Sequence, residues 1–171
     1  MAMQTKVGLY PVTGFPGQEV NPGSAIYTAE NYISDGTLTA GAFAFTSAVT
    51  GTGTAAVTGT GTAAAFKAAG KTGTALIGFV ERTVTGAILS PLNEAEGAYA
   101  QGTGASIALR GQFYASASGA VTEGQSVLVD PATGAVTYGN AGADNDTGWI
   151  VHLPNGLATA AEGDIVIYER V

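Results

Sequence analysis

Residues 123–136 read EGQSVLVDPATGAV, and this stretch carries the strongest fold signal in the chain. Two short runs rich in Val and Ala, at 126–129 and 135–138, flank the sequence DPATG. Asp at the start of a turn, Pro next and Gly at its end are typical of a type I turn with a bulge. The stretch therefore predicts a β-hairpin.

The glycine that opens this hairpin belongs to a pattern found elsewhere in the chain. TEGQSV at 122–127 resembles AEGDIV at 161–166, and TAGAF at 39–43 is a weaker copy. Such a glycine adopts a positive φ and turns the chain before strand pairing begins. In the closing run DIVIYERV, alternation places Val166, Tyr168 and Arg170 on one face of a strand and Ile165, Ile167 and Glu169 on the other.

β-branched and aromatic residues bounded by Gly, Asn, Asp and Pro predict further strands. The expected strands are 25–33, 38–45, 74–84, 105–115, 126–129, 135–138, 148–153 and 164–170. Helix signals are poor, and the run 63–69 between Gly61 and Gly70 would form two turns at most. The spacing predicts a mainly β protein, a small antiparallel β-barrel or sandwich, without the βαβ rhythm of a nucleotide-binding sheet.

Two segments stand apart from these strands. Residues 1–23 hold Pro11, Pro16 and Pro22 among glycines and predict an extended N-terminal arm before a single β domain at 24–171. Within that domain lies an inserted Gly/Ala/Thr tract at 46–73, in which GTGTAAVT at 51–58 recurs as GTGTAAAF at 59–66. Ordering so many glycines costs more conformational entropy than the burial of small side chains can offset. We therefore expect residues 50–62 to be ordered only by packing against other chains or against a sheet edge of the same chain.

Composition excludes several classes of protein. Charged residues make up 11% of the 171, against about 25% in ordinary soluble domains, which suits a subunit whose surface is largely covered. The net charge of −7 and six scattered basic residues argue against nucleic-acid binding. There is no cysteine, no apolar run long enough for a membrane span and no secretory leader, so we expect no membrane partner and assembly in the host cytoplasm.

The sequence offers only weak candidates for a catalytic or metal-binding site. His152 is the only histidine and lies in an alternating strand, and no G-x-S-x-G motif supplies a nucleophile. Glu94 and Glu96 form a carboxylate pair, as do Asp144 and Asp146, but the chain has one Trp and few charged partners for a glycosidase cleft. Residues 144–148, DNDTG, favour a turn over a calcium loop because no Glu follows at the required spacing. We therefore expect no enzyme, no catalytic residue, no metal and no cofactor.

Three motifs together resemble a known family. They are YPVTGFPGQ at 10–18, GFVER at 78–82 and EGQSVLVDPATGAV at 123–136. The chain looks like the capsid decoration, or structural cement, proteins of tailed bacteriophages. The resemblance implies a mainly β, oligomeric protein on the outer face of the virion capsid, where it clamps neighbouring major capsid subunits after the shell expands. It implies no catalytic residue.

The expected partners are thus the major capsid protein and further copies of the chain, as a homotrimer or a homodimer. The contact residues predicted from the arm and the tract are Tyr10, Pro11, Phe15, Pro16, Thr52, Thr54 and Phe66. The alternative is a receptor-binding or fibre module of a virion, or a bacterial adhesin. An aromatic groove around Tyr99, Phe113, Tyr114 or Trp149 would favour that alternative.

Overall fold

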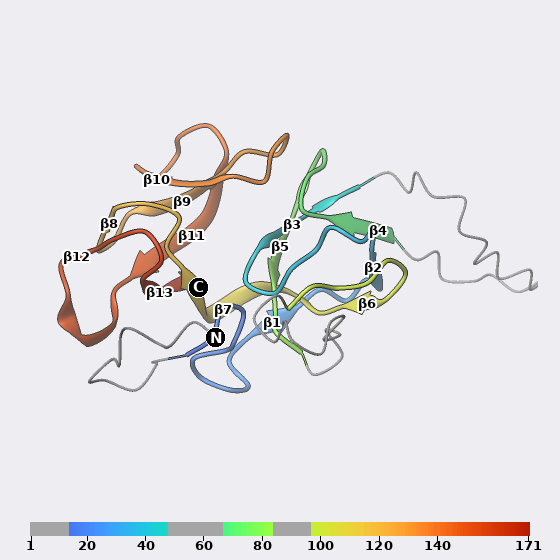
Figure 1. The fold of residues 1–171 in the computed structure, drawn as a ribbon, viewed down its shortest axis with the longest axis horizontal. Helices are drawn as coiled ribbons and strands as arrows, with labels where there is room; N and C mark the ends of the chain where they lie inside the picture. The colour runs from blue at the N-terminus through green and yellow to red at the C-terminus, as the bar shows by residue number, and fades with distance from the viewer. Residues whose placement is uncertain (1–13, 48–66, 84–96) are drawn as a thin grey trace, which may run out of the picture.

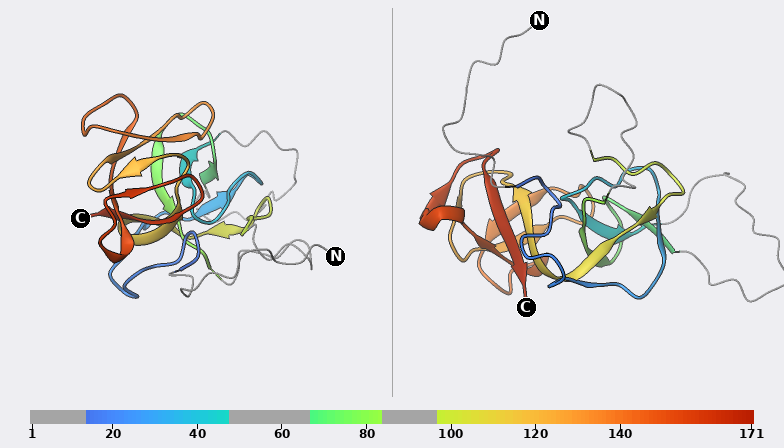
Figure 2. Two further views of the ribbon diagram at one scale, coloured as in Figure 1. Left: turned by 60° about the vertical axis from the view of Figure 1, so that its left-hand side comes forward. Right: turned by 90° about the horizontal axis from the view of Figure 1, so that it is seen from below.

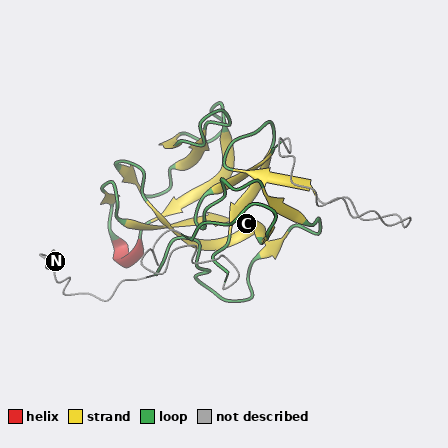
Figure 3. Cartoon of the chain, turned by 45° about the vertical axis from the view of Figure 1, so that its right-hand side comes forward, coloured by secondary structure: helices red, strands yellow, loops and turns green. Residues whose placement is uncertain are grey.

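Strands dominate the chain in the computed structural model, whose described residues are 14–47, 67–83 and 97–171 (Figure 1, Figure 3). The first half of this part holds β1 (Ile26–Tyr27), β2 (Tyr32–Ser34), β3 (Phe43–Thr46), β4 (Lys67–Gly70), β5 (Leu76–Val80) and β6 (Gly104–Ala105). The second half holds β7 (Ile107–Ser116), β8 (Val121–Thr122), β9 (Ser126–Val129), β10 (Val136–Gly139), β11 (Asp146–His152), the 3-10 turn η1 (Pro154–Gly156), β12 (Thr159–Ala160) and β13 (Ile165–Arg170). The mainly β prediction is confirmed.

The large sheet is open and mixed. Its strand order is β10-β9-β11-β13-β7-β5-β3-β4-β2-β6, with β1 beside β7, while β8 and β12 form a separate pair. Because the end strands β10 and β6 do not pair with each other, the predicted barrel is wrong: the sheet does not close. The prediction of purely antiparallel pairing is also wrong, since β2 and β4 run parallel, with Ile33 opposite Ala68.

Strand β7 joins the two parts of this sheet. Its first residues pair with β5, and residues 111–116 pair with β13. Figure 2 shows the C-terminal strands, in orange and red, on one side of β7 and the earlier strands, in blue to green, on the other. At the change of partners lies Gly111, whose φ of 130° is a conformation that side chains rarely allow. The long strand thus bends where the sheet folds over on itself.

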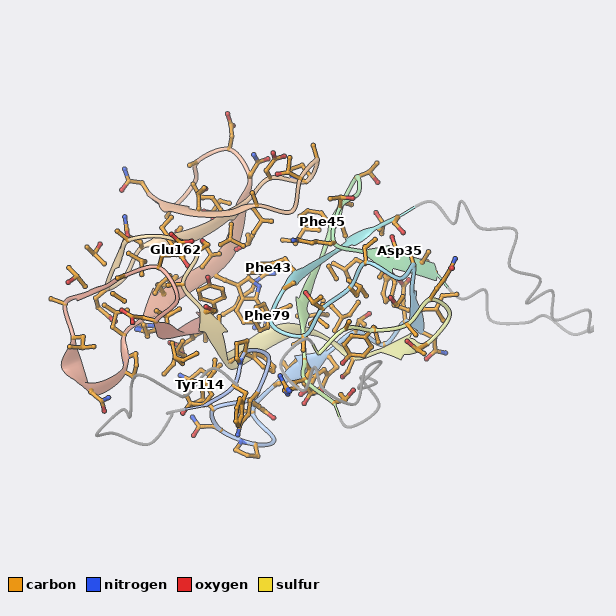
Figure 4. All side chains as sticks on the ribbon, viewed as in Figure 1. Asp35, Phe43, Phe45, Phe79, Tyr114 and Glu162 are labelled. Carbon is orange, nitrogen blue, oxygen red and sulfur yellow. The ribbon has the colours of Figure 1, made fainter. Side chains whose placement is uncertain are left out.

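The core lies between the two parts of the folded sheet. Phe43 and Phe79 come from β3 and β5, Trp149 and Tyr168 from β11 and β13, and the four rings are 2% exposed or less. The Phe79 ring lies 5.2 Å from Phe43 and 5.6 Å from Trp149, between centroids. Figure 4 places Phe43 and Phe79 in the middle of the molecule, between its two halves. This arrangement is sandwich-like.

Alternation along β3 and β5 also supplies a second, smaller core. Ala44 and Val80 point to the face opposite Phe43 and Phe79, where they pack with Leu38, Tyr99 and other residues. The same period of two holds in β13, where Val166 and Tyr168 are buried while Ile165 and Ile167 are partly exposed. The predicted two faces of this closing strand are confirmed.

The hairpin at 123–136 forms as predicted. β9 pairs with β10, with Val129 opposite Val136, and Gly134 adopts a φ of 70°. The Asp130 carboxylate accepts hydrogen bonds from Ala132 N, at 2.9 Å, and from Thr133 Oγ1, at 2.9 Å. The backbone bonds from Ala132 and Thr133 and the hydroxyl of Thr133 lower the pKa of this exposed carboxyl below its usual value, so the turn is held by an ionised Asp.

Three predicted elements differ in their extent. The strand expected at 25–33 is split into β1 and β2, because β1 pairs with β7 while β2 pairs with β4 and β6. The strand expected at 38–45 begins only at Phe43, after a turn at Gly41 with a φ of 80°. Of the short helix considered at 63–69, residues 67–69 instead belong to β4, since pairing with β2 and β3 overrides the helix propensity of Ala; the others lie outside the described residues.

Candidate functional site

The C-terminal end of the N-terminal arm lies along one edge of β7. Gly17 N donates to Tyr114 O at 2.8 Å, and Tyr114 N donates to Gln18 O at 2.9 Å. Val20 N then donates to Gln112 O at 2.8 Å. Residues 17–20 therefore cover backbone groups of β7 on the edge opposite β13, and they fix the point from which the preceding residues leave the sheet.

Phe15 and Pro16 are the predicted contact residues that lie within the described part of the chain. Phe15 is 58% exposed, and the guanidinium carbon of Arg82 lies 5.5 Å from the centroid of its ring. Pro16 packs against the backbone of Gly41, where a side chain on Gly41 would come within 2.7 Å of Pro16 Cβ. The other predicted contact residues, Tyr10, Pro11, Thr52, Thr54 and Phe66, lie outside the described residues.

Arg82 was missed as a site residue, although the motif GFVER ends on it. Arg82 N donates to Gly17 O at 2.7 Å, so the residue contacts the arm through its backbone as well as through its guanidinium. A cation over an aromatic face is stabilising by about 0.5–1 kcal/mol at exposed sites. The signal in the sequence was an arginine at the end of an apolar strand, with an aromatic residue available in the arm.

Glu19 fixes the loop that follows the arm. Its carboxylate accepts hydrogen bonds from the backbone N–H groups of Gly23, Ser24 and Ala25, at 3.1, 2.9 and 2.8 Å. Desolvation raises the pKa of this carboxyl, but the bonds from Gly23, Ala25 and Ser24 lower it further than desolvation raises it. The net pKa lies below the usual 4.5. The ionised carboxylate is therefore the form that organises residues 21–25.

We expect Glu19→Gln to lower the free energy of unfolding by roughly 1 kcal/mol at neutral pH, because the amide offers one oxygen where three N–H groups need acceptors. Since the folded state lowers the pKa of Glu19, its contribution is present above pH 4.5 and is lost as the pH falls through the lowered value. Urea unfolding of both proteins across this range tests the effect. Glu162→Gln, at an exposed position, is the charge-matched control, and a difference that does not shrink in acid would contradict the assignment.

His152 links three parts of the chain. Its Nδ1 lies 2.6 Å from Glu123 Oε1, and its Nε2 lies 2.7 Å from Glu169 Oε2. The other oxygen of Glu123 accepts from Leu153 N at 2.5 Å. The histidine thus ties the turn before β9 to β11 and β13, in agreement with the predicted structural role. Both ring nitrogens of His152 thus contact carboxylates, and among the described residues neither contacts a serine or threonine hydroxyl.

Of the two carboxylate pairs considered in the sequence, Asp144 and Asp146 lie just before and at the start of β11, and Glu94 and Glu96 lie outside the described residues. Of the turn predicted at DNDTG, Asp144 and Asn145 form a turn, with Asn145 at a φ of 66°, while residues 146–148 begin β11; Asp146 accepts from Gly142 N at 2.6 Å and from Gly148 N at 2.9 Å. Within residues 14–47, 67–83 and 97–171, no group of His, Asp or Glu is placed to hold a metal ion. In the same ranges no helix is long and apolar enough to cross a membrane.

The Gly/Ala/Thr tract at 46–73 begins in β3 and contains β4 toward its other end, and these two strands are paired. Thr46 of β3 lies opposite Ala69 of β4, and Ser47 N donates to Ala68 O at 3.1 Å. Residues 48–66 therefore connect the antiparallel strands β3 and β4 at the end where these strands are paired.

Comparison with known proteins identifies a family for this architecture. A family model described as "Structural cement protein (E217 gp24/Pam3 gp6)" matches residues 3–170, nearly the whole chain. None of the curated proteins compared with the chain matches it. The family match covers the arm, both parts of the sheet and the inserted tract together.

Proposed function

The chain belongs to the structural cement protein family of phages, and from this we propose that it binds the outer face of the expanded capsid and bridges neighbouring major capsid subunits. The observation that carries the proposal is the match to residues 3–170. The family is one of structural phage proteins, which supports a structural rather than an enzymatic role. A clamp that binds the expanded lattice better than the unexpanded one stabilises it by mass action.

The arm supports the bridging role. Its end is anchored on β7 by residues 17–20, and Phe15 stands beside that anchor with more than half of its surface exposed. An exposed aromatic ring next to an anchored segment is suited to burial against another subunit. We propose Tyr10, Pro11, Phe15 and Pro16 as capsid or subunit contacts, together with Thr52, Thr54 and Phe66 of the tract.

The aromatic residues that would line a binding groove in an adhesin are buried or partly buried. Tyr99, Phe113 and Trp149 are 1% exposed or less, so they belong to the cores of the sheet and line no surface groove. Tyr114 is partly buried against Gly14, where a side chain would clash with its ring. Incubating the protein with emptied, expanded shells and with host cells tests the choice: depletion by the shells is expected, and depletion only by the cells would overturn the proposal.

Truncation tests the contribution of the arm. We expect removal of residues 2–13 to leave the urea midpoint unchanged, since the pairing of 17–20 with β7 is kept, and to weaken shell binding at least about tenfold. Removal of residues 2–20 serves as the contrast, because it also uncovers the edge of β7 and should lower stability. Undiminished shell binding by the shorter truncation would contradict a role for the arm.

Replacement of the tract tests its contribution separately. We expect a short Asn-Gly turn in place of residues 48–66 to preserve the fold, because Thr46 and Ala69 already pair. Shell binding should fall if Thr52, Thr54 and Phe66 contact neighbours. Circular dichroism and shell sedimentation measure the two effects, and an unfolded variant would show that the tract belongs to the domain core.

The family supports a virion location, and we propose further that the protein acts as a homotrimer or homodimer assembled in the host cytoplasm. The low content of charged residues, 11%, suits a surface that is covered in an assembly. Light scattering of the free and shell-released protein measures the oligomeric state, and a monomer in both would contradict it.

A further inference from the structure

An open pocket of about 330 Å³ lies where β7 changes its neighbours. Before Gly111, Arg110 of β7 lies opposite Ile26 of β1, and Gly111 itself lies opposite Arg170 of β13. The loop that Glu19 holds forms another wall, through Asn21 and Ser24. The volume is at the lower end of the ~300–1,000 Å³ range of binding pockets, which is room for a short peptide segment.

Most polar groups of this pocket are already occupied within the protein. Asn21 Nδ2 donates to Gln112 Oε1 at 2.8 Å, and Gln112 Nε2 donates to Glu169 Oε1 at 2.8 Å. The second oxygen of Glu169 lies 2.7 Å from His152 Nε2. The acidic side chain of the pocket, Glu169, therefore has both carboxylate oxygens engaged within the protein.

Unlike these polar groups, the two arginines that line the pocket, Arg110 and Arg170, have side chains that are unpaired within the described part of the chain. Among the described residues, the side chains of Arg110 and Arg170 make no hydrogen bond or ion pair, whereas the Lys67 side chain is paired with Glu30 at 2.6 Å. The Arg170 guanidinium lies beside Gly148, where a Cβ atom would be 3.5 Å from Arg170 Nε. Ile26, which is 55% exposed, adds an apolar wall. The unused functions of the pocket are two guanidinium groups and one aliphatic surface.

We propose that this pocket binds a carboxylate-bearing segment of a neighbouring major capsid subunit, with an aliphatic side chain of that segment against Ile26. This proposal rests on the function proposed above. Guanidinium groups bind carboxylates through paired, charge-assisted hydrogen bonds. Two of the six basic residues of a chain with net charge −7 line this pocket beside Glu169, and their guanidinium groups, unpaired among the described residues, are available to an acidic ligand.

Electrostatic repulsion argues against two other possible ligands of this pocket. A nucleic acid would bring a long polyanion against the acidic remainder of the chain, and phosphate contacts need clustered basic residues over a larger surface. A second copy of this chain would bring its own charge of −7 with any carboxylate it offered.

Binding to cement-free, expanded shells of its own phage tests the proposal. The double variant Arg110→Gln/Arg170→Gln is expected to need at least about tenfold more protein for half-saturation, with an unchanged urea midpoint, because neither side chain has a partner to lose. Lys67→Gln removes one positive charge outside the pocket and should bind within about twofold of the original protein. Arg110→Lys/Arg170→Lys should fall between, since it keeps charge without the planar fork.

Cross-linking identifies the occupant. With p-benzoylphenylalanine at position 26, we expect a cross-link to a major capsid peptide that contains Asp or Glu. A cross-link only to a second copy or to nucleic acid, or equal shell binding by the double glutamine variant, overturns the inference and leaves the cement function standing. Failure of the unaltered protein to bind shells would overturn both.

Discussion

Phe79→Ala is expected to lower the free energy of unfolding by about 3–5 kcal/mol. Phe79 is fully buried, and its ring lies within 5.2 to 5.8 Å, between centroids, of four other aromatic rings. These rings come from both parts of the folded sheet, so the cavity would lie where the two parts meet. Small domains have only about 5–15 kcal/mol of stability, so the variant should be close to unfolding.

Urea unfolding followed by far-UV circular dichroism measures this loss. Ile150→Ala is the control, because Ile150 alternates with buried Trp149 on the same strand and is 43% exposed. The control should cost less than about 1 kcal/mol. A loss below that value at Phe79 would show that the aromatic cluster does not hold the two parts of the sheet together.

Gly78→Ala is expected to cost about 1–3 kcal/mol or more, although the change adds a single methyl group. Its Cβ would lie 2.2 Å from Ala108 O and 3.0 Å from Ala108 C, which are backbone atoms of β7 and cannot move as a side-chain end can. The methyl group would therefore push β5 away from β7. Thermal unfolding measures the cost.

Gly104→Ala provides a matched glycine control for this prediction. Gly104 also lies in a strand, β6, but nothing lies within 4 Å of the position that its Cβ would take. This substitution should change stability little. Equal unfolding temperatures for the two variants would contradict the close approach of β5 and β7.

Local sequence patterns correctly predicted the elements whose conformation depends on residues close in sequence. The hairpin at 126–139 formed because DPATG carries its own turn chemistry, and the faces of β13 followed from alternation. The period of two also located β7 and β11 within a few residues. In each case the residues that specify the element lie within it.

Long-range pairing was not predictable in the same way. β4 reads KAAG, which has no strand propensity, and it is a strand because β2 and β3 lie on either side of it. The open sheet follows from the change of partners along β7 at Gly111, which no local pattern revealed. The same holds for the pocket, since Ile26, Arg110 and Arg170 are brought together only by β7.

Of the predicted site, the structure describes one part. Phe15 was predicted as a contact residue from its place among prolines, and its exposure fits that role, while the stacking of Arg82 on it depends on tertiary structure. The roles of Tyr10, Pro11, Thr52, Thr54 and Phe66 stay predictions that the truncation and the tract replacement test. Catalytic residues were expected to be absent, and the family supports a structural role.

The heat stability of cement-free shells tests the central claim most directly. Expanded and unexpanded shells are titrated with the protein, and the temperature of shell disruption is followed by calorimetry. If the protein is a cement that bridges capsid subunits, the disruption temperature of expanded shells should rise with bound protein and reach a plateau at a fixed ratio, with little change for unexpanded shells. Saturated binding to expanded shells without any rise in their disruption temperature would contradict the account.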